Sequence, residues 1–479
     1  MANPEHLALL QSDEWNAWRS RNGNVTPDLT DSDFSQKNLS GKDLKRADLS
    51  RVNLCGAELS GADLSRAVLV DARVDGASAP GAIFDHCMLD FLNFKGAFLA
   101  GARFRSASVQ SCSFVGANLA GADLFRARMD GADLTEANFA GTALGDVSFR
   151  GVKTAGAHFD GADLSRCLFE GVSLARGSFP NANFEGANLK AADLTGADLR
   201  RAKFVKAILR QAALNAANCE GADFAEADME LVSAIETDFT GASFDRARVR
   251  KADLKKAILL DAVGRDVSFA DAKLTEVDMR SARFESANFQ GADLSKANFS
   301  RTNLRPYSFV GARFAKTDVS EAQAQEVNFS KADLSFGNFR LANLKRANLS
   351  ACRAFDTDLS GTLLVGANFR EATLEEADLR FARAIGADFS HATLKGADLA
   401  NADLSEARFK KTKFWGATAR RIKPPRGYAM LLSMSTTFHK AKQKKTSVVD
   451  QKEQQRKKRI AELEAEADQK PPHRTGRRR

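Results

Sequence analysis

The chain has 479 residues and a formal net charge of +9, from 70 lysines and arginines against 61 aspartates and glutamates. Residues 420–479 hold 18 of the basic and 6 of the acidic residues, so residues 1–419 carry 52 basic against 55 acidic residues. The body of the chain is therefore nearly neutral. The net charge of the whole chain therefore does not indicate a basic body that binds nucleic acid or membranes.

Residues 1–33 are expected to form an N-terminal helical cap. They lack the basic start and apolar core of a secretory signal, so we expect no export by that route. Residues 4–21 predict a helix, with Leu7 and Leu10, then Trp15 and Trp18, at i,i+3 spacing. A helix that lays these tryptophans over the first repeat would shield an exposed strand edge.

From Phe34 to Phe414 the chain contains 77 five-residue repeats without a change of register, and nearly all of them have an apolar residue at the central position, Gly264 being an exception. Alanine dominates two residues before this central position, and aspartate or asparagine often precedes it directly, as in Gly-Ala-Asp-Leu at 121–124 and 161–164. A period of five fits neither a helix nor an ordinary strand. It does fit a short extended piece that points alanine and the central residue inward. A two-residue turn would follow, with glycine often second, as at Gly61 and Gly121.

This pattern resembles the pentapeptide-repeat family, whose repeat is summarised as A(D/N)LXX, over about four fifths of the chain. The resemblance implies an all-β fold, a right-handed quadrilateral parallel β-helix with four pentapeptides per coil. Residues 34–419 would then form about 19 coils and a rod roughly 90 Å long, at about 4.8 Å per coil. Phenylalanines recurring at a stride of 20 residues support this coil length, because they would stack on one wall. The predicted core includes Leu124, Leu164, Phe184, Phe204, Phe224, Phe269, Phe289 and Phe309.

Departures from the repeat are the places where a local site would lie. Leu92 and Tyr307 occupy small inward positions where alanine is usual. The segment 305–308, with Pro306 and Tyr307, is the most irregular, and we expect a distorted wall there because proline cannot donate a backbone hydrogen bond. Either packing variation or a local groove would explain such positions.

The cysteines are predicted to be buried and unpaired rather than bridged or metal-bound. Four of the six occupy the small inward position and one a central position: Cys87, Cys112, Cys167, Cys352 and Cys219. Free cysteine behaves as a small hydrophobe, and unpaired thiols favour a reducing cytoplasmic compartment.

Residues 420–479 are expected to form a basic linker and tail. Phe414 and Trp415 close the repeats and would suit a contact through the C-terminal end, where some pentapeptide-repeat proteins form homodimers. The tail either remains solvated or attracts nucleic acid or an anionic membrane surface. Its basic residues include Lys444, Lys445, Arg456, Lys457, Lys458 and Arg459.

No catalytic, cofactor-binding or metal-binding residues are predicted. The six histidines are scattered without metal-ligand spacing, and the carboxylates recur as an outward ladder along the repeats. No glycine-rich phosphate loop followed by lysine is present. The sequence therefore predicts a protein that is not an enzyme.

The function predicted from the sequence is that of a bacterial, cytoplasmic scaffold that binds a protein partner through the walls or ends of a rod. Two alternatives come from the family resemblance: a DNA mimic that binds DNA gyrase or topoisomerase IV, and a secreted bacterial effector that binds host proteins. Lysines and arginines interleaved with the acidic residues, such as Lys190, Arg200 and Lys203, argue against the DNA mimic.

Overall fold

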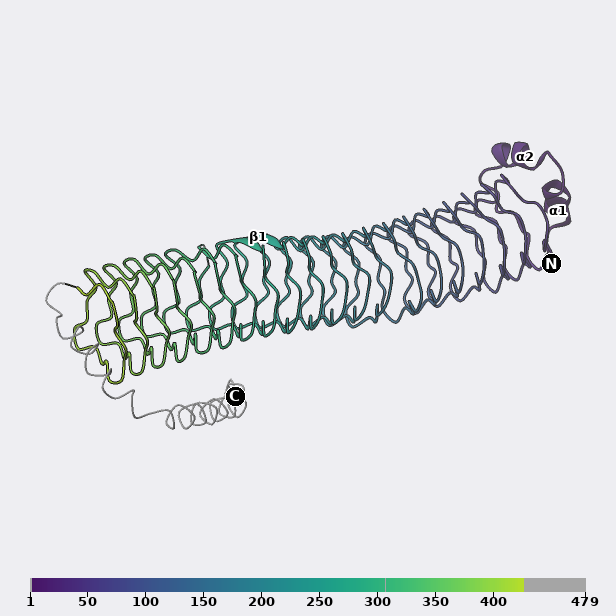
Figure 1. Cartoon of the computed structure of the whole chain (residues 1–479). Helices are drawn as coiled ribbons and strands as arrows, with labels where there is room; N and C mark the ends of the chain where they lie inside the picture. The colour runs from purple at the N-terminus through teal and green to yellow at the C-terminus, as the bar shows by residue number, and fades with distance from the viewer. Residues whose placement is uncertain (1, 306, 426–479) are drawn as a thin grey trace, which may run out of the picture.

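A computed structural model describes residues 2–305 and 307–425 as a long rod of stacked coils, with two helices at its N-terminal end (Figure 1). The helices are α1, Pro4–Leu10, and α2, Trp15–Arg21. The strands in the described residues are β1, Val263–Arg265, and β2, Arg283–Glu285, which pair in parallel. Elsewhere in the rod each extended piece is reduced to a single bridging residue.

Parallel bridges join residues that are 20 positions apart, from Asp28 and Asp48 to Asp403 and Lys423. This register gives four pentapeptides to each coil. The bridging residues follow one another every five positions, so each coil has four walls, and residues 20 apart form a column on one wall. The ladder starts before residue 34 and runs past residue 419. The last bridge in the described residues is at Lys423, and Pro424 has no amide hydrogen to donate to a further coil.

Every corner between two walls has one residue in the left-handed region. The φ angle is positive at every fifth described residue from Asp31 to Arg421, with glycine at some corners, as at Gly61 and Gly121, and other residues at most of them. At most corners the following amide closes the turn, as in the 2.9 Å hydrogen bond from Ala122 N to the Leu119 carbonyl. No valine, isoleucine or threonine occupies these described corners, because β-branched side chains tolerate a positive φ least.

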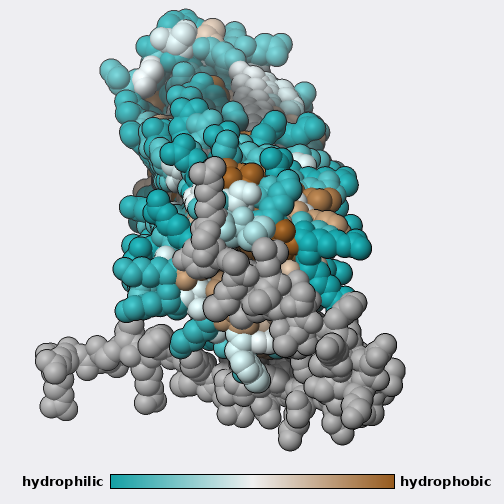
Figure 2. All heavy atoms as spheres, turned by 60° about the vertical axis from the view of Figure 1, so that its left-hand side comes forward, coloured by the Kyte–Doolittle hydropathy of each residue, from teal (hydrophilic) through white to brown (hydrophobic). Residues whose placement is uncertain are grey.

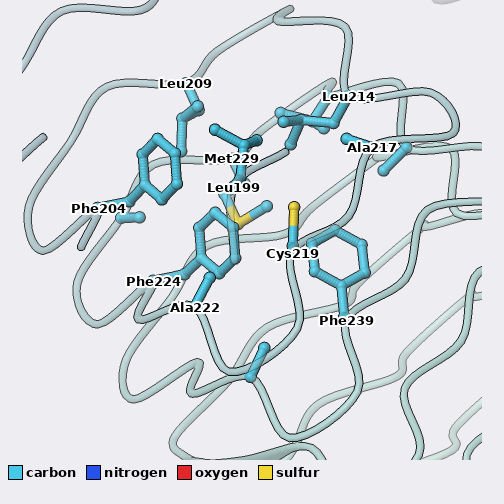
Figure 3. Close-up of a cluster of buried hydrophobic side chains, with 14 of the residues drawn as sticks. Leu199, Phe204, Leu209, Leu214, Ala217, Cys219, Ala222, Phe224, Met229 and Phe239 are labelled. Carbon is cyan, nitrogen blue, oxygen red and sulfur yellow. The ribbon is translucent and has the colours of Figure 1, made fainter. Parts of the chain in front are cut away.

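The core of the rod consists of the central residues and the small residues two positions before them. The rings of Phe184, Phe204 and Phe224 stack at centroid distances of 4.8 and 4.9 Å, with interplanar angles of 4° and 2°. Figure 3 shows the rings of Phe204 and Phe224 along one side of the coil interior, together with Met229 and Phe239. All of the core residues named from the sequence are fully buried, namely Leu124, Leu164, Phe184, Phe204, Phe224, Phe269, Phe289 and Phe309.

The expectation of one helix over residues 4–21 is wrong, because the chain breaks it after Leu10. Both the amide and the hydroxyl of Ser12 bond to the Leu9 carbonyl, at 3.0 and 2.8 Å. A serine that competes in this way for a helix carbonyl favours a turn. The break allows α2 to cross the end of the first coil separately from α1.

Side chains of α2 supply hydrogen-bond partners to the edge of the first coil. Trp15 is fully buried, and its Nε1 donates to the Asp43 carbonyl at 2.8 Å. The Asn16 amide accepts from Asp43 N and donates to the Gly41 carbonyl, both at 2.9 Å. Arg19 donates to the Lys45 carbonyl at 2.8 Å. The helical cap thus replaces the coil that would otherwise lie here.

Candidate interaction surfaces

The described residues contain no group of three His, Cys, Asp or Glu side chains that could hold a metal ion. None of the described helices has the length and apolar composition of a membrane span. Six cysteines are unpaired, and five of them are buried. Burial raises the pKa of Cys87, Cys112 and Cys167 to about 12, so these thiols stay protonated at neutral pH.

The aspartates and asparagines before the central positions hold the corners of the coil. Asp63 Oδ1 accepts from the amide of Ser65 at 3.0 Å and from its hydroxyl at 2.6 Å. Asn118 accepts from the amide of Ala120 and from the side-chain amide of Asn138 in the next coil. The outward ladder of carboxylates and amides therefore has a structural role.

Many charges on the walls are paired with charges in the next coil. The carboxylate of Asp146 lies 2.6 Å from Arg166 and 3.3 Å from Arg126. The hydrogen bond from Arg166 is the main cause that lowers the pKa of the Asp146 carboxyl. Glu170 pairs in the same way with Lys190 at 2.7 Å. Such exposed pairs add little stability but reduce the charge that a wall presents to a partner.

One wall carries a column of bridging aspartates. Seven of its eleven bridging residues between 198 and 398 are aspartates, at 198, 238, 278, 318, 358, 378 and 398. Three of these are paired with an arginine two residues later, at 2.6–2.7 Å for Arg200, Arg280 and Arg380. The column is thus acidic, but arginines on the same wall neutralise part of its charge.

At the C-terminal end the two aromatic residues predicted to make an end contact differ in exposure. Phe414 is 8 % exposed and its ring packs 5.2 Å from that of Phe409. Trp415 is 77 % exposed and lies beside Lys395, whose ammonium is 5.4 Å from the ring centroid. Only Trp415 is therefore available on the surface. The basic residues named in the tail, Lys444 to Arg459, lie outside the described residues.

The irregular segment 305–308 disturbs the ladder through the side chain of Tyr307. This side chain is buried in a small inward position, and its hydroxyl accepts from Phe284 N at 3.1 Å and donates to the Ala282 carbonyl at 3.4 Å. Burial raises the pKa of Tyr307 to about 12, so the hydroxyl stays neutral. Arg283 does not bridge to Asn303, unlike its counterparts in neighbouring coils. The tyrosine hydroxyl takes the place of a backbone carbonyl as the partner of Phe284 N.

Replacing Tyr307 by phenylalanine is expected to lower the free energy of unfolding by about 1–3 kcal/mol, because Phe284 N would lose its partner inside the core. Urea unfolding measures the loss, and amide exchange at Phe284 should accelerate. Unchanged protection of that amide would contradict the assigned role of the hydroxyl.

A second interruption, at the irregular position of Leu92, opens a groove on the surface, which is one of the two explanations that the sequence left open. It lies where residues 68–75 stack against residues 88–95. Within the described chain, five amides in these segments lack the backbone hydrogen bond to the neighbouring coil that their counterparts form in regular coils: those of Leu69, Asp71, Val74, Met88 and Asn93. In the following coil the corresponding bonds of Leu89, Phe91 and Phe94 form at 2.7–2.9 Å. The bridge between Val68 and Met88 remains, whereas no bridge joins Arg73 to Asn93, so the ladder is interrupted at this point. A similar gap lies between Lys153 and Ser173.

Leu92 explains the interruption. Its side chain is 3 % exposed and fills an inward position that holds Ala72 in the preceding coil and Cys112 in the following one. Protein interiors are closely packed, so we attribute the lost hydrogen bonds between the two coils to the larger leucine. The sequence signal was present in Leu92 itself, since leucine there departs from the usual alanine.

The resulting groove has a volume of about 460 Å³, and its lining is mainly apolar. Phe91 occupies a corner with φ of 68° and is 80 % exposed, while Met88 is 61 % and Val70 is 49 % exposed. We call this site the Phe91 groove. Its lining residues are Val70, Asp71, Ala72, Met88, Asp90, Phe91 and Leu92.

Other exposed apolar side chains are more dispersed. Phe381 and Leu341 are 62 % and 53 % exposed at corners of a different wall. Figure 2 shows a mainly hydrophilic face on which apolar side chains form small separate islands. The Phe91 groove is distinct because it combines exposed apolar side chains, a hollow and an interrupted ladder.

These features define a repeat β-helix solenoid. Pentapeptide repeats match residues 28–66, 67–105, 192–230, 232–262, 265–305, 308–346, 347–390 and 387–422. A pentapeptide repeat region matches residues 102–179. The chain belongs to the pentapeptide-repeat family, as its five-residue period predicted.

Several solved structures are similar to parts of the chain. HetL, a pentapeptide repeat protein involved in heterocyst differentiation regulation in the cyanobacterium Nostoc, is 27% identical, with 54% of this chain and 91% of HetL covered and a TM-score of 0.21. QnrB1, a plasmid-mediated fluoroquinolone resistance protein, is 19% identical, with 42% and 92% covered and a TM-score of 0.19. A pentapeptide repeat protein of the Arabidopsis thaliana thylakoid lumen is 30% identical, with 25% and 67% covered and a TM-score of 0.14. No curated protein sequence matches the chain.

Proposed function

We propose that this chain is a non-enzymatic scaffold, a rigid rod that binds a protein partner on its walls. The Phe91 groove carries the proposal. Exposed apolar side chains that line a hollow are typical of protein-binding sites, whereas single exposed ones are common on any surface. The buried thiols and the carboxylates at the corners form contacts that stabilise the coil. These side chains therefore give no reason to propose a reaction in place of binding.

The proposal includes the right-handed quadrilateral coil that the family resemblance implies. In such a rod each coil touches only its neighbours, so a site on one wall stays at a fixed distance from every other site. This geometry suits a protein that holds partners at set positions.

A DNA mimic is the second candidate, and the column of seven aspartates on one wall favours it. A topoisomerase that binds DNA would meet regularly spaced negative charges there. Arg200, Arg280 and Arg380 weaken this candidate, because each neutralises an aspartate of the same column. A supercoiling assay with DNA gyrase distinguishes the two functions, since only the mimic should inhibit the enzyme.

The scaffold function is tested by quantitative affinity capture from an extract of the native host, with the full-length chain and two variants as baits. Phe91→Asp places a charge in the groove, and Phe381→Asp makes the same change at an exposed corner outside it. We expect a protein that the unmodified chain and Phe381→Asp retain and that Phe91→Asp loses by at least about tenfold, the effect of removing one aromatic anchor. The same set of proteins on all three baits would contradict the groove as a binding site.

A further inference from the structure

The Phe91 groove is apolar at its centre and acidic at its rim. Val70, Met88 and Phe91 supply exposed apolar surface. Asp71 and Asp90 are the charged residues in its lining, and no ion pair involves either of them within the described residues. Asp90 Oδ1 accepts hydrogen bonds from the Ser108 hydroxyl at 2.6 Å and from Gln110 N at 2.8 Å. A suitable occupant would bury apolar side chains in the hollow and place basic side chains near these two carboxylates.

The chain contains a segment with this chemistry just beyond the described residues. Residues 428–434 read Tyr-Ala-Met-Leu-Leu-Ser-Met, and Arg426 precedes them. Lysines follow at 440, 442, 444 and 445. We propose that residues 428–434 of a second copy of the chain occupy the Phe91 groove, an inference that rests on the groove being a docking site as proposed above.

The distance along the rod requires a second copy. With 20 residues per coil, Phe91 lies about 16 coils, or roughly 80 Å, from Pro425. Met434 is nine residues beyond Pro425, and nine fully extended residues span only about 30 Å. Residues 428–434 therefore cannot reach the groove of their own chain.

Two rods lying side by side in opposite directions would bring each segment to the other's groove. The groove lies only about three coils from the first bridge at Asp28, so it is near the N-terminal end of the rod. In an antiparallel pair this end lies next to the C-terminal end of the partner. A two-fold axis would then form two identical contacts, and the pair would be closed against further growth. Each contact would also strengthen the other by holding it at high local concentration.

Analytical ultracentrifugation of the full chain tests the inference, together with photo-crosslinking from p-benzoylphenylalanine placed at position 91. We expect a dimer whose dissociation constant rises by at least about tenfold in Phe91→Asp and in Leu431→Asp, because each removes an apolar contact. Phe381→Asp should leave it unchanged. In mixtures of ¹⁴N- and ¹⁵N-labelled chains, crosslinks from position 91 should join differently labelled chains and map to residues 426–445.

A further variant, Leu92→Ala, tests the contribution of the groove independently of the Phe91 side chain. It should let the two coils close, and it should weaken the dimer although Phe91 is retained. A thermal unfolding midpoint of Phe91→Asp equal to that of the unmodified chain would show that lost association is not lost folding. A monomer, or crosslinks that map within one chain or to another wall, would overturn the second copy as the occupant. Crosslinks from position 91 to a different protein would do the same while supporting the proposed scaffold function.

Discussion

Phe204→Ala is expected to lower the free energy of unfolding by about 3–5 kcal/mol, the range for removing a large buried aromatic side chain. The Phe204 ring is fully buried and stacks on a ring in each adjacent coil, so alanine would leave a cavity that two coils share. Phe381→Ala is the matched control, because that side chain is 62 % exposed. It should change stability by no more than about 0.5 kcal/mol.

Urea unfolding followed by circular dichroism measures the size of the effect, and hydrogen exchange measures where it occurs. Because each coil contacts only its neighbours, the loss of protection should centre on the coils around residue 204 and leave the first coils unchanged. Equal destabilisation by the two alanine variants would contradict the assignment of Phe204 to the core.

Trp15→Ala is the second substitution with a large expected effect, a loss of about 3–5 kcal/mol. It removes a fully buried side chain and the hydrogen bond to the Asp43 carbonyl. Protection from exchange should fall in residues 28–50. The uncovered edge should also promote association between chains, visible as a larger particle in light scattering.

Two variants separate the contributions of Trp15. Trp15→Phe keeps most of the buried volume but removes Nε1, and it should lower stability by only about 1 kcal/mol. Trp415→Ala changes a tryptophan that is 77 % exposed and should have little effect. If Trp15→Ala neither lowered stability nor increased association, the helices would not act as a cap.

The five-residue period was sufficient to predict the family and the inward-facing residues, because a repeat of this length leaves few other arrangements. Leu124 and Leu164 lie at the central position and are fully buried. The corners were harder to describe. Glycine was expected to be frequent there, but most corners hold other residues, and the turn hydrogen bond keeps them in the left-handed region.

The sequence marked Leu92 as irregular and left two explanations open, packing variation or a local groove, and it could not decide between them. A larger inward residue does not always interrupt the ladder. Val232 also fills a small inward position, yet the bonds of Leu231 N, Ser233 N and Asp253 N around it form at 2.8–3.0 Å. Whether coils separate depends on the volume and on the neighbours above and below, which only the stacked structure shows.

The helix break and the different exposure of Phe414 and Trp415 both depend on local contacts and positions that the sequence analysis did not resolve. Sequence spacing predicted a helix over residues 4–21, but the hydrogen bonds of Ser12 to the Leu9 carbonyl decide locally where α1 ends. Phe414 lies at a central position and points inward, whereas Trp415 follows it and points to solvent.

Because the register is 20 residues, each of the four walls repeats independently along the rod axis, one bridging residue per coil. Inserting or deleting one pentapeptide would move every later residue to the adjacent wall. A change between residues 198 and 398 would therefore cut the column from Asp198 to Asp398 into two columns that face different directions. Changes of 20 residues would keep each surface in line and alter only the distance along the axis. A length change that preserves binding on two distant parts of one wall should therefore come in whole coils.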